Sequence, residues 1–185
     1  MAYAQALEKA WDDVLNSAGE RNFSVKLLSD VYDIDVNKKQ ILSESCNIPA
    51  KEHISIIILH YLIQKLKTGI VPAPGGEWID FNQLEGGDGY YPAFKKRTID
   101  RILKKYGKRP DGLLKAAGRF PASRVDIGDV GIVISTFENV PILITMSKGD
   151  EEFEPAANIV FDKTISQIMC TEDIIVLTEF IVHSL

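Results

Sequence analysis

The sequence has few cysteines and no long apolar run. Two of its 185 residues are cysteines, Cys46 and Cys170, which are too few for a disulfide framework and too far apart for a paired-cysteine metal site. The longest apolar candidate, Ile54–Leu59, is much shorter than the roughly 18 residues that indicate a membrane-spanning helix. Residues 1–15 carry three acids and lack the basic start of a secretory signal. We therefore expect a cytoplasmic protein with no membrane span.

Sequence motifs of the common enzyme classes are also missing. The chain contains no phosphate-binding P-loop, no dinucleotide-binding glycine fingerprint, no serine nucleophile elbow and no HExxH zinc motif. His53 and His60 are seven positions apart in an expected helix, about 10.5 Å, which is too far for both to hold one metal ion. The sequence thus identifies no catalytic residue, no metal ligand and no cofactor. Whether the protein is an enzyme stays open, with a non-catalytic role favoured.

The charged residues are unevenly distributed along the chain. The net charge of −5 combines −5 over residues 1–94, +9 over residues 95–124 and −9 over residues 125–185. More than half of all basic residues therefore lie within thirty positions. The acidic total disfavours nucleic-acid binding by the whole molecule, but a local basic face can still hold an anion. The alternative is that the basic and acidic segments face each other or water.

Apolar periodicity predicts an α+β fold made of one domain over residues 1–185. Helical spacing of apolar residues indicates helices at 3–17, 50–67, 92–106 and 111–117, and one from residue 171 onwards. Strand patterns occur at 23–28, 32–36, 130–146 and 159–161, with Glu138-Asn139 as a hairpin turn and a glycine- and proline-rich loop at 70–90. Because strands come in adjacent pairs, we expect an antiparallel sheet of hairpins packed against several helices. The consecutive apolar residues of 130–146 predict cover on both faces of the sheet.

The segment GGDGYYPAFKKR is the strongest candidate binding site. It joins flexible glycines to three aromatic residues and a run of cations, a combination that suits a flat anionic ligand. We expect Tyr90, Tyr91 and Phe94 to stack on the ligand. Arg97 and Arg101 would bind its carboxylates, because the guanidinium fork pairs with carboxylates bidentately. The alternative is a layer of core aromatics beneath a solvated basic face.

A second candidate site consists of acids in the C-terminal third. A hard divalent cation needs several converging oxygens, and carboxylates are concentrated between residues 126 and 162. These acids are Asp126, Asp129, Asp150, Glu151, Glu152 and Asp162. Their spacing does not match an EF-hand loop. They support an alternative function as a metal-dependent enzyme.

Three strings resemble a prokaryotic family, the domain of unknown function three-seven-eight-six, which occurs mostly in anaerobic bacteria and archaea. The likeness covers nearly the whole chain. The three strings are GGDGYYPAFKKRTIDRILKKYG, DIGDVGIVISTFENVPILI and GDEEFEPAANIVFDKTISQIMCTEDIIVL. The most specific elements are Gly149–Phe153, Phe161-Asp162 and Glu172-Asp173. Many relatives have a tryptophan just before the first of these, where this chain has residues 145–148, Thr-Met-Ser-Lys.

The resemblance implies a metabolic setting but no reaction. Longer members of that family add a cysteine-rich iron–sulfur segment like that of the corrinoid iron–sulfur protein of one-carbon metabolism. This sequence lacks the segment, so an iron–sulfur cluster is not implied. We expect a cytosolic accessory or ligand-binding protein of anaerobic cofactor metabolism, of the corrinoid or other tetrapyrrole type. It would bind a planar anionic small molecule or dock a corrinoid or iron–sulfur protein, and its oligomeric state stays open.

Overall fold

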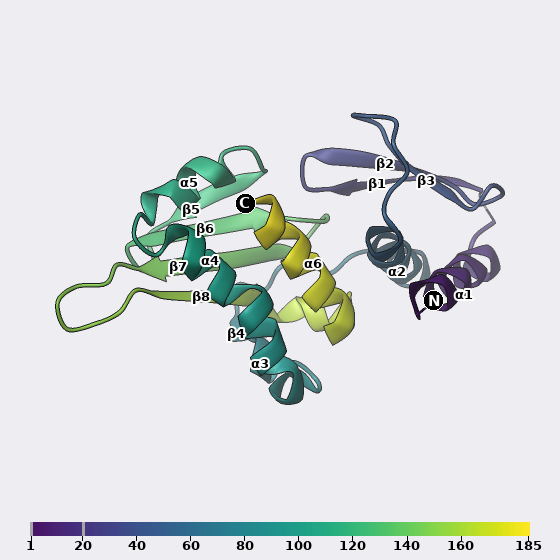
Figure 1. Cartoon of the computed structure of the whole chain (residues 1–185). Coiled ribbons are helices and arrows are strands. Elements are labelled where there is room, and N and C mark those ends of the chain that lie inside the picture. The colour runs from purple at the N-terminus through teal and green to yellow at the C-terminus, as the bar shows by residue number, and fades with distance from the viewer. Residues whose placement is uncertain (1, 20) are drawn as a thin grey trace.

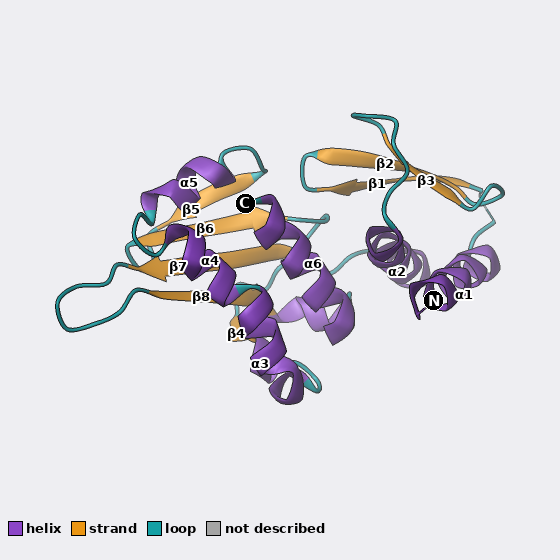
Figure 2. Ribbon diagram, in the orientation of Figure 1, coloured by secondary structure: helices purple, strands orange, loops and turns teal. Residues whose placement is uncertain are grey.

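The computed structural model describes residues 2–19 and 21–185 and has an α+β fold with two antiparallel sheets (Figures 1 and 2). The first half of the chain contains α1 (Ala2–Ser17), β1 (Asn22–Leu27), β2 (Asp30–Asp35), β3 (Gln40–Ser43) and α2 (Glu52–Thr68). The second half contains β4 (Trp78–Asp80), α3 (Gly87–Arg97), α4 (Ile99–Tyr106), α5 (Asp111–Ala117), β5 (Ala122–Val125), β6 (Val130–Ser135), β7 (Pro141–Ser147), β8 (Ala156–Asp162) and α6 (Thr171–Ser184).

The first half is a three-stranded meander that packs on α1 and α2. Its strands lie in the order β1-β2-β3, and the alternation of the strand residues sends Val25 and Ile34 to the helix side. Helix α2 follows the predicted apolar pattern, and Ile57 within it is fully buried. It ends at Gly69, whose φ of 74° is a left-handed conformation that glycine adopts without a Cβ clash. The strands predicted at 23–28 and 32–36 and the helices predicted at 3–17 and 50–67 are therefore confirmed.

The second half is a five-stranded sheet in the order β4-β8-β7-β6-β5, with α3 to α6 on one face (Figure 1). The sequence predicted that both faces of this sheet are covered. Helices cover only one face, so the prediction is wrong for the other face. On the face opposite them, the register places Leu143 between Val133 and Val160. Leu143 is only 3% exposed, and it does not belong to the main hydrophobic cluster. Neighbouring apolar side chains on adjacent strands shield one another, which explains the consecutive apolar residues without a second helical layer.

Aromatic and backbone contacts join the two halves. The ring of Tyr61 on α2 stacks on Phe137 of the β6–β7 hairpin, with centroids 4.4 Å apart. The backbone N–H of Leu28 donates to the carbonyl oxygen of Thr136 at 2.7 Å. Buried apolar side chains of both halves belong to one continuous cluster. The position of α6 relative to α2 is therefore fixed by packing, and α6 forms one wall of the site described below.

Two predicted boundaries are wrong. The segment 70–90 is not a continuous loop, because it contains β4, the short helix η1 (Phe81–Gln83) and the first turn of α3. The predicted helix 92–106 is two helices separated by Thr98, whose φ of −122° and ψ of −72° are not helical. The buried Thr98 hydroxyl donates to the carbonyl oxygen of Phe94 at 2.7 Å. Side-chain bonding of this kind competes with the backbone ladder and favours a break.

Among the described residues, no helix has both the length and the apolar character needed to cross a membrane.

Candidate functional site

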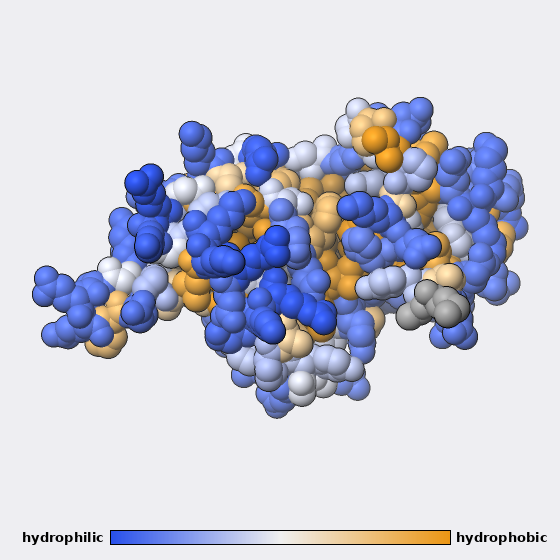
Figure 3. Space-filling view, in the orientation of Figure 1, coloured by the Kyte–Doolittle hydropathy of each residue, from blue (hydrophilic) through white to orange (hydrophobic). Residues whose placement is uncertain are grey.

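A groove of about 660 Å³ lies between the α3–α4 pair and α6. Its walls are formed by Ala93, Lys96, Arg97, Asp100, Arg101, Lys104, Glu179 and His183. Figure 3 shows strongly hydrophilic side chains gathered over α4 and the adjoining part of α6. The groove includes both arginines that the sequence analysis selected.

Helical spacing aligns the basic wall of the groove. Ala93, Arg97, Arg101 and Lys104 recur at steps of three and four residues, so they share one side of the α3–α4 pair. The opposite side of the same pair is buried, with Phe94 and other apolar residues in the hydrophobic core. Because the core side anchors both helices, the break at Thr98 does not separate the two arginines.

The cations of the groove are only partly neutralised. Arg97 Nη1 lies 3.1 Å from Glu179 Oε1, across from α3 to α6. Asp100 lines the groove but accepts a hydrogen bond from Lys95, outside the lining. Within residues 2–19 and 21–185, no ion pair is formed by Lys96, Arg101 or Lys104. The groove therefore presents net positive charge to a ligand.

The α6 wall adds a histidine with a defined tautomer. His183 Nδ1 lies 2.7 Å from the backbone carbonyl oxygen of Glu179, one turn earlier in α6. A carbonyl oxygen only accepts hydrogen bonds, so Nδ1 carries the proton and donates it. The Nε2 atom is left for a ligand. It accepts a hydrogen bond when the ring is neutral and donates one when the ring is protonated.

The structure distributes the predicted aromatic residues over different environments. Tyr90 is 51% exposed and lies one turn before Ala93 in α3, outside the groove lining. Tyr91 is half-buried, with its ring centroid 6.4 Å from that of Phe94. Phe94 is 1% exposed and stacks on Phe81 at 4.0 Å, so its ring belongs to the core. Of the five predicted ligand-binding residues, Arg97 and Arg101 line the groove, Tyr90 and Tyr91 lie outside its lining, and Phe94 is not accessible to a ligand.

The glycines before α3 serve packing. Gly86 has a φ of 70°. A Cβ on Gly87 would lie 2.1 Å from the carbonyl oxygen of Phe81, so only glycine allows α3 to begin this close to η1. The amide of Gly87 already donates to the carbonyl oxygen of Leu84 at 2.9 Å. These features account for Gly86 and Gly87 of the predicted binding segment, whereas a Cβ on Gly89 would meet open space.

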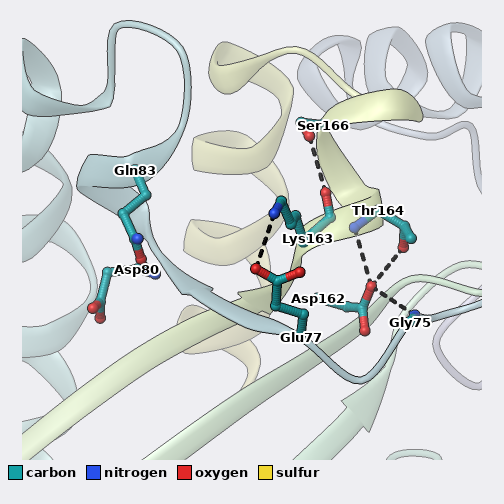
Figure 4. A network of polar contacts seen from close by, with 8 residues as sticks. All are labelled: Gly75, Glu77, Asp80, Gln83, Asp162, Lys163, Thr164 and Ser166. Atoms are coloured by element: carbon teal, nitrogen blue, oxygen red, sulfur yellow. Dashed lines mark hydrogen bonds and ion pairs between the residues drawn. The ribbon is translucent and has the colours of Figure 1, made fainter.

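The acids of residues 126–162 are dispersed, and three of them stabilise loops. Asp129 accepts from the backbone N–H of Lys148, and Asp150 accepts from two amides of its own loop, which lowers the Asp150 pKa. Asp162 accepts from Gly75 and Thr164 (Figure 4). It also accepts from the backbone N–H of Gly76. Burial raises the Asp162 pKa, but these bonds outweigh it and the net change is downward. The described residues contain no group of three or more histidines, cysteines or acids that could hold a metal ion.

A second polar cluster joins α2 to the start of α6. His60 Nδ1 lies 2.8 Å from Asp173 Oδ2, and the Asp173 side chain is buried. The hydrogen bond with Asp173 raises the His60 pKa, and burial opposes that rise only in part. Burial and the Asp173 charge raise the pKa of the Cys170 thiol to about 12, so this cysteine stays protonated. The cluster is suited to holding two helices together.

Sequence reasoning did not identify Glu179 and His183 as groove residues. They lie four positions apart in a helix whose other residues are mostly apolar, and this spacing is the signal that places them on one side of α6. Which helix they face depends on tertiary packing, which the sequence pattern does not give.

Comparison with known proteins identifies the family of this chain. Neither the curated proteins nor the solved structures contain a match to this chain. The profile described as Domain of unknown function (DUF3786) matches residues 9–184. That range includes the groove and both sheets, so the chain belongs to the DUF3786 family.

Proposed function

We propose that the protein binds a small anionic molecule in the groove between α3–α4 and α6, as a cytosolic accessory or ligand-binding protein. The observation that carries this proposal is that Arg97 and Arg101 line one groove together with Lys96 and Lys104. A volume of about 660 Å³ lies within the range of roughly 300–1,000 Å³ found for small-molecule sites. Tyr90, which is exposed on α3 one turn before the groove residue Ala93, offers a flat surface on which a planar ligand could stack.

The charge distribution supports binding over simple solvation of a basic face. If the basic segment 95–124 existed to pair with the acidic segment 125–185, ion pairs would link the two. Within the described part of the chain, Arg97–Glu179 is the one ion pair that does so. The remaining cations of the groove are left to an external anion.

The metabolic setting is part of the proposal. The family resemblance points to anaerobic cofactor metabolism of the corrinoid, tetrapyrrole or one-carbon type. A carboxylate-bearing planar cofactor of that metabolism, or a partner protein that carries one, matches the chemistry of arginines beside an exposed tyrosine.

Native mass spectrometry of protein purified without oxygen tests this function. We expect a stoichiometric small-molecule adduct on the wild type and none on the Arg97→Gln, Arg101→Gln double variant. A Lys9→Gln, Lys67→Gln variant, which loses the same two charges far from the groove, should keep the adduct. An adduct that survives both arginine substitutions places the ligand elsewhere, and a clean wild-type mass contradicts a tightly held ligand.

A further inference from the structure

The groove already contains a carboxylate bound to one of its arginines. Glu179 Oε1 lies 3.1 Å from Arg97 Nη1, and these residues come from opposite walls. The side chain of Arg97 is largely exposed, so the pair is open to solvent on one side. Exposed ion pairs are weak and exchange readily. The Glu179 carboxylate therefore occupies a position at Arg97 where an anionic group of a ligand could bind instead.

The α4 half of the groove has cations of its own. Arg101 and Lys104 lie one turn apart on the basic wall, and His183 lines the opposite wall. Among the described residues, no acid lies within ion-pair distance of Arg101 or Lys104. With His183 Nδ1 bonded to the Glu179 carbonyl oxygen, its Nε2 atom is the ring nitrogen left to meet a ligand. This half is a second anion position.

The two positions are separated by one turn of α6 on one wall and by the α3–α4 junction on the other. Arg97 and Arg101 are four residues apart on one wall, and Glu179 and His183 are four residues apart on the other. On the continuous helix α6, side chains at this spacing have Cβ atoms about 6 Å apart, whereas Arg97 and Arg101 lie on either side of the break at Thr98. The groove thus has two anion positions in line, one of them filled by Glu179.

We propose that the groove recognises a ligand with two anionic groups about one helical turn apart. One group binds at Arg101, Lys104 and His183, and the other replaces the Glu179 carboxylate at Arg97. This inference rests on the proposed function, since it specifies the ligand of the same groove. It follows that a ligand with one anionic group binds beside Glu179 without displacing it, whereas a ligand with two groups competes with Glu179.

Titration calorimetry with simple carboxylates measures both the spacing and the competition. The probes are acetate and the dicarboxylates malonate, succinate, glutarate and adipate, at one pH and constant ionic strength. The proteins are the wild type, Glu179→Gln and Glu172→Gln, the last of which removes the same charge from the exposed start of α6. We expect one dicarboxylate length to bind best. Glu179→Gln should tighten that dicarboxylate about threefold more than it tightens acetate, and Glu172→Gln should change both alike.

The outcomes separate this inference from the proposed function. If affinity does not depend on dicarboxylate length, or if Glu179→Gln changes acetate and dicarboxylates equally, the two-position arrangement is wrong. The groove function then still stands, provided that Arg97→Gln with Arg101→Gln weakens binding of these probes. If no carboxylate binds the wild type, the groove function and this inference both fail. Equal melting temperatures of the wild type and Glu179→Gln verify that the variant is folded.

Discussion

At the scale of single residues, the contact between His60 and Asp173 links the two halves of the molecule by a bond that depends on pH. Asp173 raises the His60 pKa above its ordinary value, through a hydrogen bond and its charge, and Asp13 adds a smaller effect in the same direction. Burial and Lys9 act in the opposite direction. When the pKa of a histidine is higher in the folded state than in the unfolded state, its protonation stabilises the fold. This stabilisation is fully present at pH values below the unfolded-state pKa. That stabilisation is lost as the pH rises through the folded-state pKa.

We predict that His60→Gln lowers the melting temperature at pH 5.5 and has a smaller effect at pH 8. The difference between the two effects should be about 2 °C, because the imidazole is half-exposed and such pairs contribute little. His53→Gln on the same helix is the matched control, because no ion pair of the described residues includes His53. A His60→Gln effect that grows with rising pH contradicts the assigned direction of the pKa change.

Part of the candidate site could be predicted residue by residue. The basic spacing identified Arg97 and Arg101, because helical periodicity alone puts them on one side of the α3–α4 pair. The role of Phe94 could not be predicted, since an aromatic residue beside cations fits a ligand platform and a core equally well. The structure places it against Phe81, thirteen positions earlier. Glu179 lies in α6, which begins more than seventy positions after Arg97, and no local sequence pattern pairs the two residues.

At the scale of elements, the orientation of the basic wall depends on how α3 begins. Gly87, the first residue of α3, lies against η1. Phe94, the core residue of α3, stacks on Phe81 of η1. The two contacts fix the start and the rotation of α3. They thereby set the direction in which Arg97 points, and the break at Thr98 then allows α4 its own axis.

We predict opposite stability effects for two glycines of α3. Gly87→Ala introduces a Cβ that would overlap the carbonyl oxygen of Phe81, so it should lower the free energy of unfolding by about 1–3 kcal/mol. Gly89→Ala has open space around its Cβ and should raise the free energy by about 0.5–1 kcal/mol, because alanine favours the helix. Urea denaturation measures both values. Equal effects at the two positions would show that the close approach to η1 is unimportant.

Most elements could be predicted because their apolar periodicity is strong. Helices α1, α2 and α6 and the β6–β7 hairpin follow it closely. Strand β4 could not be predicted, since three residues are too few to show an alternating apolar pattern. Its pairing partner, β8, is far away in the sequence. The same holds for β5, whose partner residues lie in β6. The break at Thr98 was also missed, because the buried environment of its hydroxyl depends on tertiary contacts.

At the scale of the whole molecule, the groove lies where the basic and acidic segments of the chain meet. The basic residues 95–124 form α4, α5 and the end of α3, and the acidic residues 125–185 include α6. Packing of α6 beside α3 brings a second acid, Glu179, into a groove that already contains Asp100 and four cations. The net charge of −5 therefore conceals a local cationic surface, and long-range attraction of anions to that surface should weaken with salt.

The central claim is that this groove binds an anion, and a calorimetric titration with pyrophosphate at constant ionic strength tests it most directly. We predict saturable binding at one site of the wild type. Affinity should fall at least about tenfold in the Arg97→Gln, Arg101→Gln variant, because charge-assisted hydrogen bonds contribute about 1.5–3 kcal/mol each. The Lys9→Gln, Lys67→Gln variant should bind as the wild type does. Absence of binding, or equal affinity in all three proteins, would contradict the account.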